Sequence, residues 1–252
     1  MLSTVSTCAF PATAQPLASS SDWTLSTSTT LTSQYVSRGV RQSWGRPALQ
    51  VGVEAVHVKG WSAGVWSSSV SSRFVEGGSL EADLYAGYSG SVGNIGYSAT
   101  VYTYRYPGAR IATTATRYDY TEVAFGLTQG PWCARYYRTV SRDFFGITHA
   151  RGTGYLDLAA NIDAGGGYTL NLHVGDGRVA GTGNDIWDWR DAKAGITRTF
   201  AGGWNAALAV TRARGATGAY DAYTTGVPDS AGRLHVANPL ATSLIVSAGR
   251  TF

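Results

Sequence analysis

The sequence predicts an all-β protein, a closed antiparallel up-and-down transmembrane β-barrel of about 12 strands. Three observations lead to this fold. Many segments alternate apolar with small or polar residues, large aromatic residues recur at a fixed spacing, and short connections alternate with long ones. Charged residues make up only 14% of the chain, against about 25% in ordinary soluble domains, which favours a membrane protein.

The composition excludes several other classes of protein. No uninterrupted apolar run approaches the ~20 residues of a membrane-spanning helix. The 8 Trp, 15 Tyr and 7 Phe residues provide apolar surface that a disordered chain lacks. The net charge is +4, but the basic residues are scattered among carboxylates, so we expect no nucleic-acid partner.

Large aromatic residues open five of the alternating segments, at Trp61, Tyr97, Trp132, Tyr168 and Trp204, with spacings of 35 or 36 residues. Each repeat holds two alternating halves, which predicts one long β-hairpin per repeat. In chain order, the predicted strands cover residues 23–38, 49–55, 61–65, 80–86, 97–101, 123–127, 132–136, 156–162, 168–174, 192–196, 204–210 and 244–248.

The connections between these strands alternate in length. Short ones are expected at residues 58–60, 89–94, 128–131, 163–167 and 201–203, and long ones at 71–79, 106–117, 141–154, 175–184 and 213–240. The first connection on the long side, at residues 43–47, is shorter than the rest. Short periplasmic turns and long extracellular loops are typical of barrels in the outer membrane of a Gram-negative bacterium, which is the predicted location.

The apolar side of each strand is predicted to face lipid, because a chain in lipid must satisfy its backbone hydrogen bonds internally and only a helix or a closed barrel does so. Outer-membrane lipid and lipopolysaccharide are therefore expected partners, with Arg138 at the outer rim. The C-terminal strand, which ends in Phe252, is expected to engage the barrel-assembly machinery. A membrane girdle of aromatic residues is predicted from Trp23, Trp61, Tyr97, Trp132, Tyr168, Trp204 and Phe252.

The first residues of the chain are uncharged and end in Ala12-Thr13-Ala14, a small-x-small pattern typical of a signal-peptidase site. Residues 1–14 are therefore interpreted as a signal-peptide remnant and residues 15–252 as the barrel. An ordinary chain terminus is the alternative.

Several segments resemble the TorF family of proteobacterial outer-membrane porins. The similarity is clearest in YVSRG at residues 35–39, GRPALQ at 45–50, GSLEADLYAGYSG at 78–90, YRYPGA at 104–109 and DFFG at 143–146. The resemblance covers about residues 31–252 and implies an outer-membrane barrel with passive transport. It implies no particular solute.

If the apolar positions face lipid, the alternate positions face the lumen. The expected pore-lining residues are Glu54, Glu81, Asp83, Tyr85, Tyr102, Tyr104, Tyr120, Glu122, Arg135, Tyr137, Tyr155, Asp157, Asn171, His173, Asp191 and Lys193. Strand order predicts that Arg135 bridges Glu122 and Asp157. These groups either form a constriction that selects small polar solutes, with a weak preference for cations, or fill a narrow barrel as a plug.

The leading function is a porin-like channel for passive diffusion of small polar solutes or ions. Alternatives are a non-conducting barrel whose outer loops bind a partner or anchor the envelope, a lipid hydrolase, and a soluble β-sandwich. Gly60, Ser62 and Gly64 match a nucleophile elbow, but a strand follows where that motif needs a helix. We therefore expect no enzyme, catalytic residue, metal or cofactor.

Overall fold

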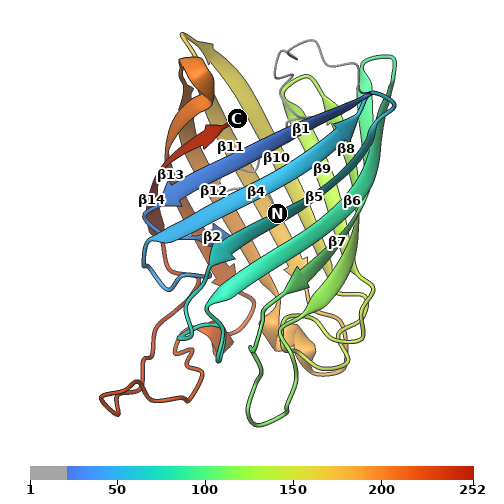
Figure 1. Ribbon diagram of the computed structural model, residues 1–252. Coiled ribbons are helices and arrows are strands. Elements are labelled where there is room, and N and C mark those ends of the chain that lie inside the picture. The colour runs from blue at the N-terminus through green and yellow to red at the C-terminus, as the bar shows by residue number, and fades with distance from the viewer. Residues whose placement is uncertain (1–21) are drawn as a thin grey trace.

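Twelve antiparallel strands close into a barrel in the computed structural model, which describes residues 22–252 (Figure 1). The predicted signal-peptide remnant lies outside these residues. The barrel strands are β1 (Trp23–Thr32), β4 (Ala48–His57), β5 (Trp61–Ser69), β6 (Leu80–Val92), β7 (Ile95–Arg105), β8 (Tyr120–Gln129), β9 (Trp132–Thr139), β10 (Gly154–Gly165), β11 (Tyr168–Arg178), β12 (Trp189–Thr199), β13 (Trp204–Gly215) and β14 (Ser243–Thr251).

The barrel closes because β1 pairs with both β14 and β4. Ser28 lies opposite Thr251 on one side, and Thr32 lies opposite Ala48 on the other. Every strand therefore has two neighbours and no sheet edge remains, as a lipid environment requires. The predicted fold class and strand number are confirmed.

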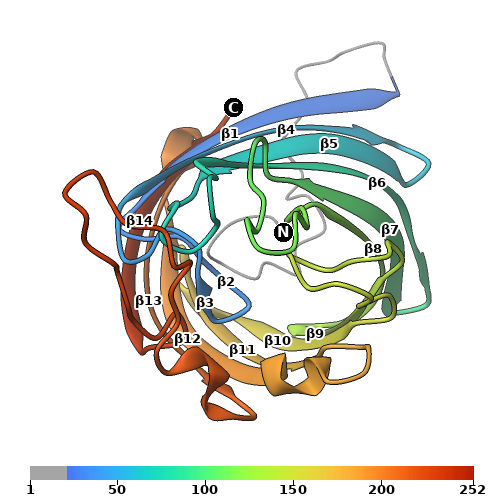
Figure 2. The ribbon, with the colours of Figure 1, turned by 90° about the horizontal axis from the view of Figure 1, so that it is seen from below.

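The first strand is shorter than its alternation predicts. It ends at Thr32 rather than near Arg38, and the chain then forms a separate two-stranded hairpin from β2 (Val36–Ser37) and β3 (Val40–Arg41). We call residues 33–47, which connect β1 and β4 and contain this hairpin, the inner loop. Figure 2 looks along the barrel and shows β2 and β3 inside the ring of strands.

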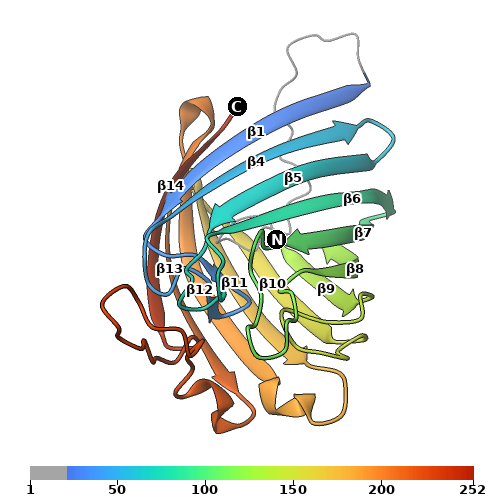
Figure 3. The same ribbon diagram turned by 60° about the horizontal axis from the view of Figure 1, so that its bottom comes forward.

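The two ends of the barrel differ in the length of their connections. The short turns lie together at one end, and the long loops lie together at the other, where the connection from β13 to β14 extends beyond the rim (Figures 1 and 3). The only helices among the described residues are short 3-10 turns, η1 (Asn184–Trp187), η2 (Ala201–Gly203) and η3 (Gly218–Tyr220). None of them is long or apolar enough to cross a membrane.

The outer surface of the barrel is apolar. Phe125 is 60% exposed, Leu244 62% and Val101 48%, and the same pattern continues around the strands. A belt of exposed apolar side chains on a monomer in water is a large unfavourable surface, but in lipid it is the expected one. The apolar positions do not pack against each other, which excludes the soluble sandwich.

The aromatic residues of the predicted girdle are also exposed, with Trp132 at 63% and Phe252 at 61%. Two arginines stack on them at the short-turn end. The Arg198 guanidinium lies 4.9 Å from the Tyr168 ring centroid, and that of Arg250 lies 4.5 Å from the Phe252 ring centroid. Amphipathic rings with a cation beside them suit a headgroup layer, so the girdle stays our prediction for this end.

Candidate functional site

The lumen holds the candidate functional residues. Of the sixteen residues predicted to line it, thirteen are buried on the inner face of the barrel, and Glu54, Arg135 and Lys193 are half-buried. All sixteen point away from the apolar outer belt, because each lies at the alternate position of its strand. Their placement agrees with the alternation, and their role in lining a solute path remains a proposal.

The interior changes character along the barrel axis. Towards the short turns the inward positions carry small residues, including Ser28, Gly64, Gly87, Gly126, Gly195 and Gly249. Towards the long loops they carry Trp66, Tyr104, Tyr120, Tyr155 and Trp189, all buried. Because the inward side chains are large towards the long loops and small towards the short turns, the lumen narrows towards the long-loop end.

Glycine is required where a tyrosine crosses the inner wall. A Cβ on Gly175 would meet the Tyr155 hydroxyl and the Asp191 carboxylate, whose Oδ1 would lie 2.5 Å away. The missing side chain therefore lets the Tyr155 ring lie across β11 and reach β12. An aromatic residue that covers a glycine on the neighbouring strand is a common way to stabilise a glycine in a sheet.

The inner loop supplies an arginine to the narrow part of the lumen. Arg38 Nη1 and Nη2 donate to the two Glu122 carboxylate oxygens at 3.1 and 2.6 Å. The side chains are 6% and 0% exposed. Glu122 also accepts from the Thr139 hydroxyl at 3.4 Å. A bidentate, buried guanidinium–carboxylate pair fixes both position and orientation, so it holds the inner loop against β8.

Aromatic rings hold the same arginine from the sides. Its guanidinium carbon lies 4.4 Å from the Tyr137 ring centroid and 4.6 Å from that of Tyr155. The Arg38 carbonyl accepts from Trp189 Nε1 at 2.9 Å. The planar guanidinium, unlike the ammonium of a lysine, can stack on rings and bind a carboxylate at the same time. Four strands of the barrel wall, β8, β9, β10 and β12, thus hold one loop residue.

The tip of the hairpin also touches the wall opposite β8. Gly39 has φ +76°, and a Cβ at this position would lie 2.5 Å from Asp191 Cβ and 2.6 Å from Ala213 Cβ. Only glycine combines this left-handed backbone with so close an approach. The inner loop therefore spans the lumen between β8 and the β12–β13 pair.

A second polar network lies on β10, β11 and β12. His173 Nδ1 lies 2.9 Å from Asp157 Oδ1, and its Nε2 lies 2.8 Å from Asp191 Oδ2. The Tyr155 hydroxyl donates to Asp191 Oδ1 at 2.8 Å. An imidazole between two carboxylates donates to both of them only when both ring nitrogens carry protons. This network links the three strands beside Gly39, at the tip of the inner loop.

The predicted bridge from Glu122 through Arg135 to Asp157 is wrong. Glu122 pairs with Arg38, Asp157 pairs with His173, and Arg135 Nη1 donates to the Tyr137 hydroxyl at 3.2 Å. Residues on neighbouring strands were correctly placed, but a residue from the inner loop took the carboxylate. Arg38 is thus a site residue that strand alternation missed. The signal was the Arg38-Gly39 pair at the end of the predicted strand, where a glycine permits a tight turn back into a second short strand.

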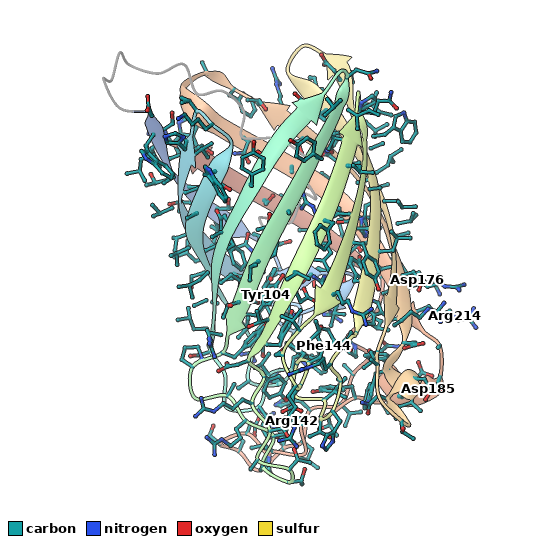
Figure 4. The ribbon with its side chains drawn as sticks, turned by 90° about the vertical axis from the view of Figure 1, so that its right-hand side faces the viewer. Tyr104, Arg142, Phe144, Asp176, Asp185 and Arg214 are labelled. Atoms are coloured by element: carbon teal, nitrogen blue, oxygen red, sulfur yellow. The ribbon has the colours of Figure 1, made fainter. Side chains whose placement is uncertain are left out.

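The outer end of the lumen is filled by aromatic residues from strands and long loops. Phe74, Tyr106, Tyr118 and Phe144 from the loops are buried with Tyr104 and Tyr120 from β7 and β8 in one apolar cluster. The Tyr104 and Tyr120 rings stack with centroids 4.3 Å apart. Figure 4 shows Phe144 below Tyr104, at the long-loop end. Here a packed aromatic cluster, and not charged groups alone, narrows the lumen.

A family model described as a bacterial protein of unknown function (Gcw_chp) matches residues 17–239. The chain belongs to this family. Among curated proteins, no sequence matches the chain.

Two solved structures with the same fold are titled as porins. A structure titled "KdgM porin" superposes with a TM-score of 0.55 at 7% identity and covers 90% of this chain and 99% of that one. A second, "KdgM porin in complex with disordered oligogalacturonate", gives 0.54 at 8% identity and covers 90% and 99%. At this identity the likeness shows the fold alone.

The apolar outer belt and the closed strand ladder place this Gcw_chp chain in the outer membrane of a Gram-negative bacterium. A barrel satisfies its backbone hydrogen bonds in lipid, and the exposed residues of this one match hydrocarbon rather than water.

Proposed function

We propose that this chain is an outer-membrane porin-like channel for passive diffusion of small polar solutes or ions, and that the inner loop forms its constriction. The observation that carries the proposal is the hairpin inside the barrel, held by Arg38 on Glu122 at the level where the lumen narrows. A charged loop at this level supplies the polar constriction that a selective pore requires.

The chemistry of the inner wall supports polar solutes. Six carboxylates point inward, from Glu54, Glu81, Asp83, Glu122, Asp157 and Asp191. The basic side chains there are Arg38, Arg135, His173 and Lys193, so the carboxyl groups outnumber the basic groups. Rings of carboxylates favour cations in a pore, and a weak cation preference is part of the proposal.

The second candidate is a non-conducting barrel whose loops bind a partner or anchor the envelope. The aromatic cluster at the outer end favours it, because side chains rather than water occupy that part of the lumen. A lipid hydrolase is less favoured, since within residues 22–252 the side chains that bind His173 are two carboxylates and a tyrosine, with no serine among them.

Ion conduction through a planar bilayer separates these candidates. The purified chain should give steady single-channel steps, with a reversal potential under a KCl gradient that favours K⁺. A silent membrane, with protein shown to be folded by its heat-dependent electrophoretic mobility, supports the anchor instead. Release of fatty acid from phospholipid vesicles would support the hydrolase.

The proposal includes lipopolysaccharide as a lipid partner, and it adds a second site to the one expected at Arg138. Arg190 lies directly opposite Arg214 on the outward face of β12 and β13, and Arg212 lies two residues further along β13. Asp176 binds Arg190 at 2.7 Å, and Figure 4 shows Asp176 and Arg214 projecting from the barrel wall. Like charges at opposite positions repel, so an anionic headgroup between them would stabilise the arrangement.

Assembly and family naming complete the proposal. The exposed Phe252 after β14 is where we expect the barrel-assembly machinery to engage. The sequence resemblance to the TorF porins is consistent with the same function, and membership of that family remains proposed.

A further inference from the structure

A cavity of ≈ 310 Å³ lies at the long-loop end of the barrel, on the long-loop side of the Arg38–Glu122 pair. Its size lies within the ~300–1,000 Å³ typical of small-molecule sites. Loops and strands both contribute to its wall, including Phe74, Phe144, Phe145, Ile147 and Trp189. Because these loops lie at the extracellular end of the predicted orientation, the cavity lies on the side from which a solute from outside would enter.

The wall of this cavity is mostly aromatic. The Phe74 and Phe145 rings stack with centroids 5.4 Å apart, and the Phe144 ring lies nearly parallel to Trp189, at 13° with centroids 6.5 Å apart. Ile111, Ile147 and Trp187 are only partly buried although they pack on the apolar cluster. Apolar side chains left in contact with a cavity gain free energy when an apolar ligand covers them.

Charge is almost absent from the wall. Among the described lining residues, the only side chain that is charged at neutral pH is Arg38, and Glu122 neutralises it. Burial raises the pKa of the Tyr118, Tyr220 and Tyr223 phenols above the ordinary value, so these lining groups stay neutral. A charged ligand would lose hydration here and find no free partner of opposite charge.

The backbone at Phe145 shows that its ring is held in place at a cost. Phe144 and Ile147 exchange two backbone hydrogen bonds, at 3.0 and 2.8 Å, around Phe145 and Gly146. Both turn residues have positive φ, 46° and 82°. A tight turn of this kind favours Asn-Gly, and a non-glycine aromatic residue at its first position is strained. The strain is compensated by contacts of the ring, which faces the cavity.

We propose that this cavity binds a small uncharged aromatic molecule, with the Phe145 ring as a principal contact. The inference goes beyond the proposed function, which concerns polar solutes in the lumen, and adds a separate apolar ligand at the long-loop end; it rests on that function only for any passage of the ligand onward through the lumen. Apolar, ring-lined walls select flat apolar faces, and the neutral environment selects against ions. A sugar could hydrogen-bond to lining groups such as Gln42, Thr114 and Asn184, but it would cover the phenylalanine faces less well than a flat aromatic ring.

Binding of benzyl alcohol to the purified chain in lipid nanodiscs tests the proposal. Saturation-transfer NMR should show saturable binding, which benzoate, benzylamine and methyl glucoside should not match. The Phe145→Asn variant should bind about tenfold more weakly or not at all, because it removes the ring but keeps a residue that the turn favours. Asparagine relieves the strain of the turn but loses the contacts of the ring with Phe74 and Tyr118. Heat-dependent electrophoretic mobility like that of the parent shows that a loss of binding does not reflect misfolding.

Phe125→Leu is the matched control, since Phe125 lies on the lipid face and is 60% exposed. It should bind like the parent, which separates the cavity from partition of the probe into lipid. Absence of saturable binding, equal binding by Phe145→Asn, or tighter binding of the glucoside would each overturn the inference. Saturable binding in a chain that conducts no current would contradict the proposed channel and leave the cavity site intact, and conduction without binding would do the reverse.

Discussion

Arg38 and Glu122 are 84 residues apart in the chain and form a bidentate pair inside the barrel, at 3.1 and 2.6 Å. Through this pair a loop that leaves β1 is tied to β8, on a different part of the wall. The relationship explains why the hairpin of β2 and β3 lies in the lumen rather than outside it. It also gives the most accessible point at which to disturb the constriction.

Breaking the pair from one side should destabilise the barrel and loosen the inner loop. Glu122→Ala leaves the Arg38 guanidinium buried without its carboxylate, and we expect a loss of about 3–5 kcal/mol in the free energy of unfolding. Urea unfolding from lipid vesicles measures this loss. The Arg38→Ala/Glu122→Ala double variant should lose less free energy of unfolding than the two single variants lose together. A loss in the double variant equal to the sum of the two single losses would show that the pair is not coupled.

Gly39→Ala should displace the hairpin tip. The new methyl group would meet Asp191 and Ala213, and the backbone has φ +76°. Gly232→Ala is a matched control, since Gly232 also has φ +76° but has open space around its Cα. We expect both to pay about 1–2 kcal/mol for the left-handed backbone and Gly39→Ala to cost at least ~1 kcal/mol more. Equal costs in urea unfolding would mean that the tip does not press on the wall.

Arg214→Ala should act in opposite directions with and without lipopolysaccharide. In phospholipid alone it removes the repulsion between Arg190 and Arg214, so stability should stay equal or rise slightly. Lipopolysaccharide should bind the variant more weakly by about 1 kcal/mol, so less of it should remain bound after purification at low salt. Arg198→Ala, an outward arginine at the short-turn end, should retain as much as the parent. Equal retention by all three proteins would remove the proposed lipid site.

Asp229 should order the tip of the β13–β14 loop in a pH-dependent way. Hydrogen bonds from the Arg233 backbone, first, and from the His235 ring lower its carboxyl pKa to about 2, against ~3.9 in an unfolded chain. Since the folded pKa is the lower one, the loop structure is fully present above about pH 4 and is lost as the pH falls through about 2. A spin label at Ser230→Cys should therefore become more mobile only in that window. Mobility that does not change between pH 5 and 1.5 would contradict this.

The lipid face was predictable from the sequence because it follows a physical rule with period two. Leu84, Val101 and Leu208 all lie outward and exposed, as their alternation requires, and the inward partners follow automatically. The strand number and the two kinds of connection follow from the aromatic spacing. These features depend on neighbours in sequence and on lipid outside, and a single sequence carries both.

The inside of the barrel was less predictable because a lumen accepts many arrangements. Residues 33–38 hold no proline or glycine that would mark a break after β1, so the pattern does not distinguish a strand in the wall from a hairpin within it. Glu122 could choose among Arg135 on the next strand and Arg38 on a distant loop, and the choice depends on three-dimensional geometry. Aromatic residues in the long loops likewise gave no sign that they pack into the outer mouth.

Single-channel recording of the parent chain beside a variant without the inner loop tests the central claim most directly. Residues 34–46 can be replaced by a short Gly-Ser turn, because Thr32 and Ala48 face each other in the register of β1 and β4. The parent should conduct in small steps. The single-channel conductance of the variant should be higher by about twofold or more, since the hairpin no longer crosses its lumen. Two silent membranes, from proteins that are both folded as barrels, would contradict the account.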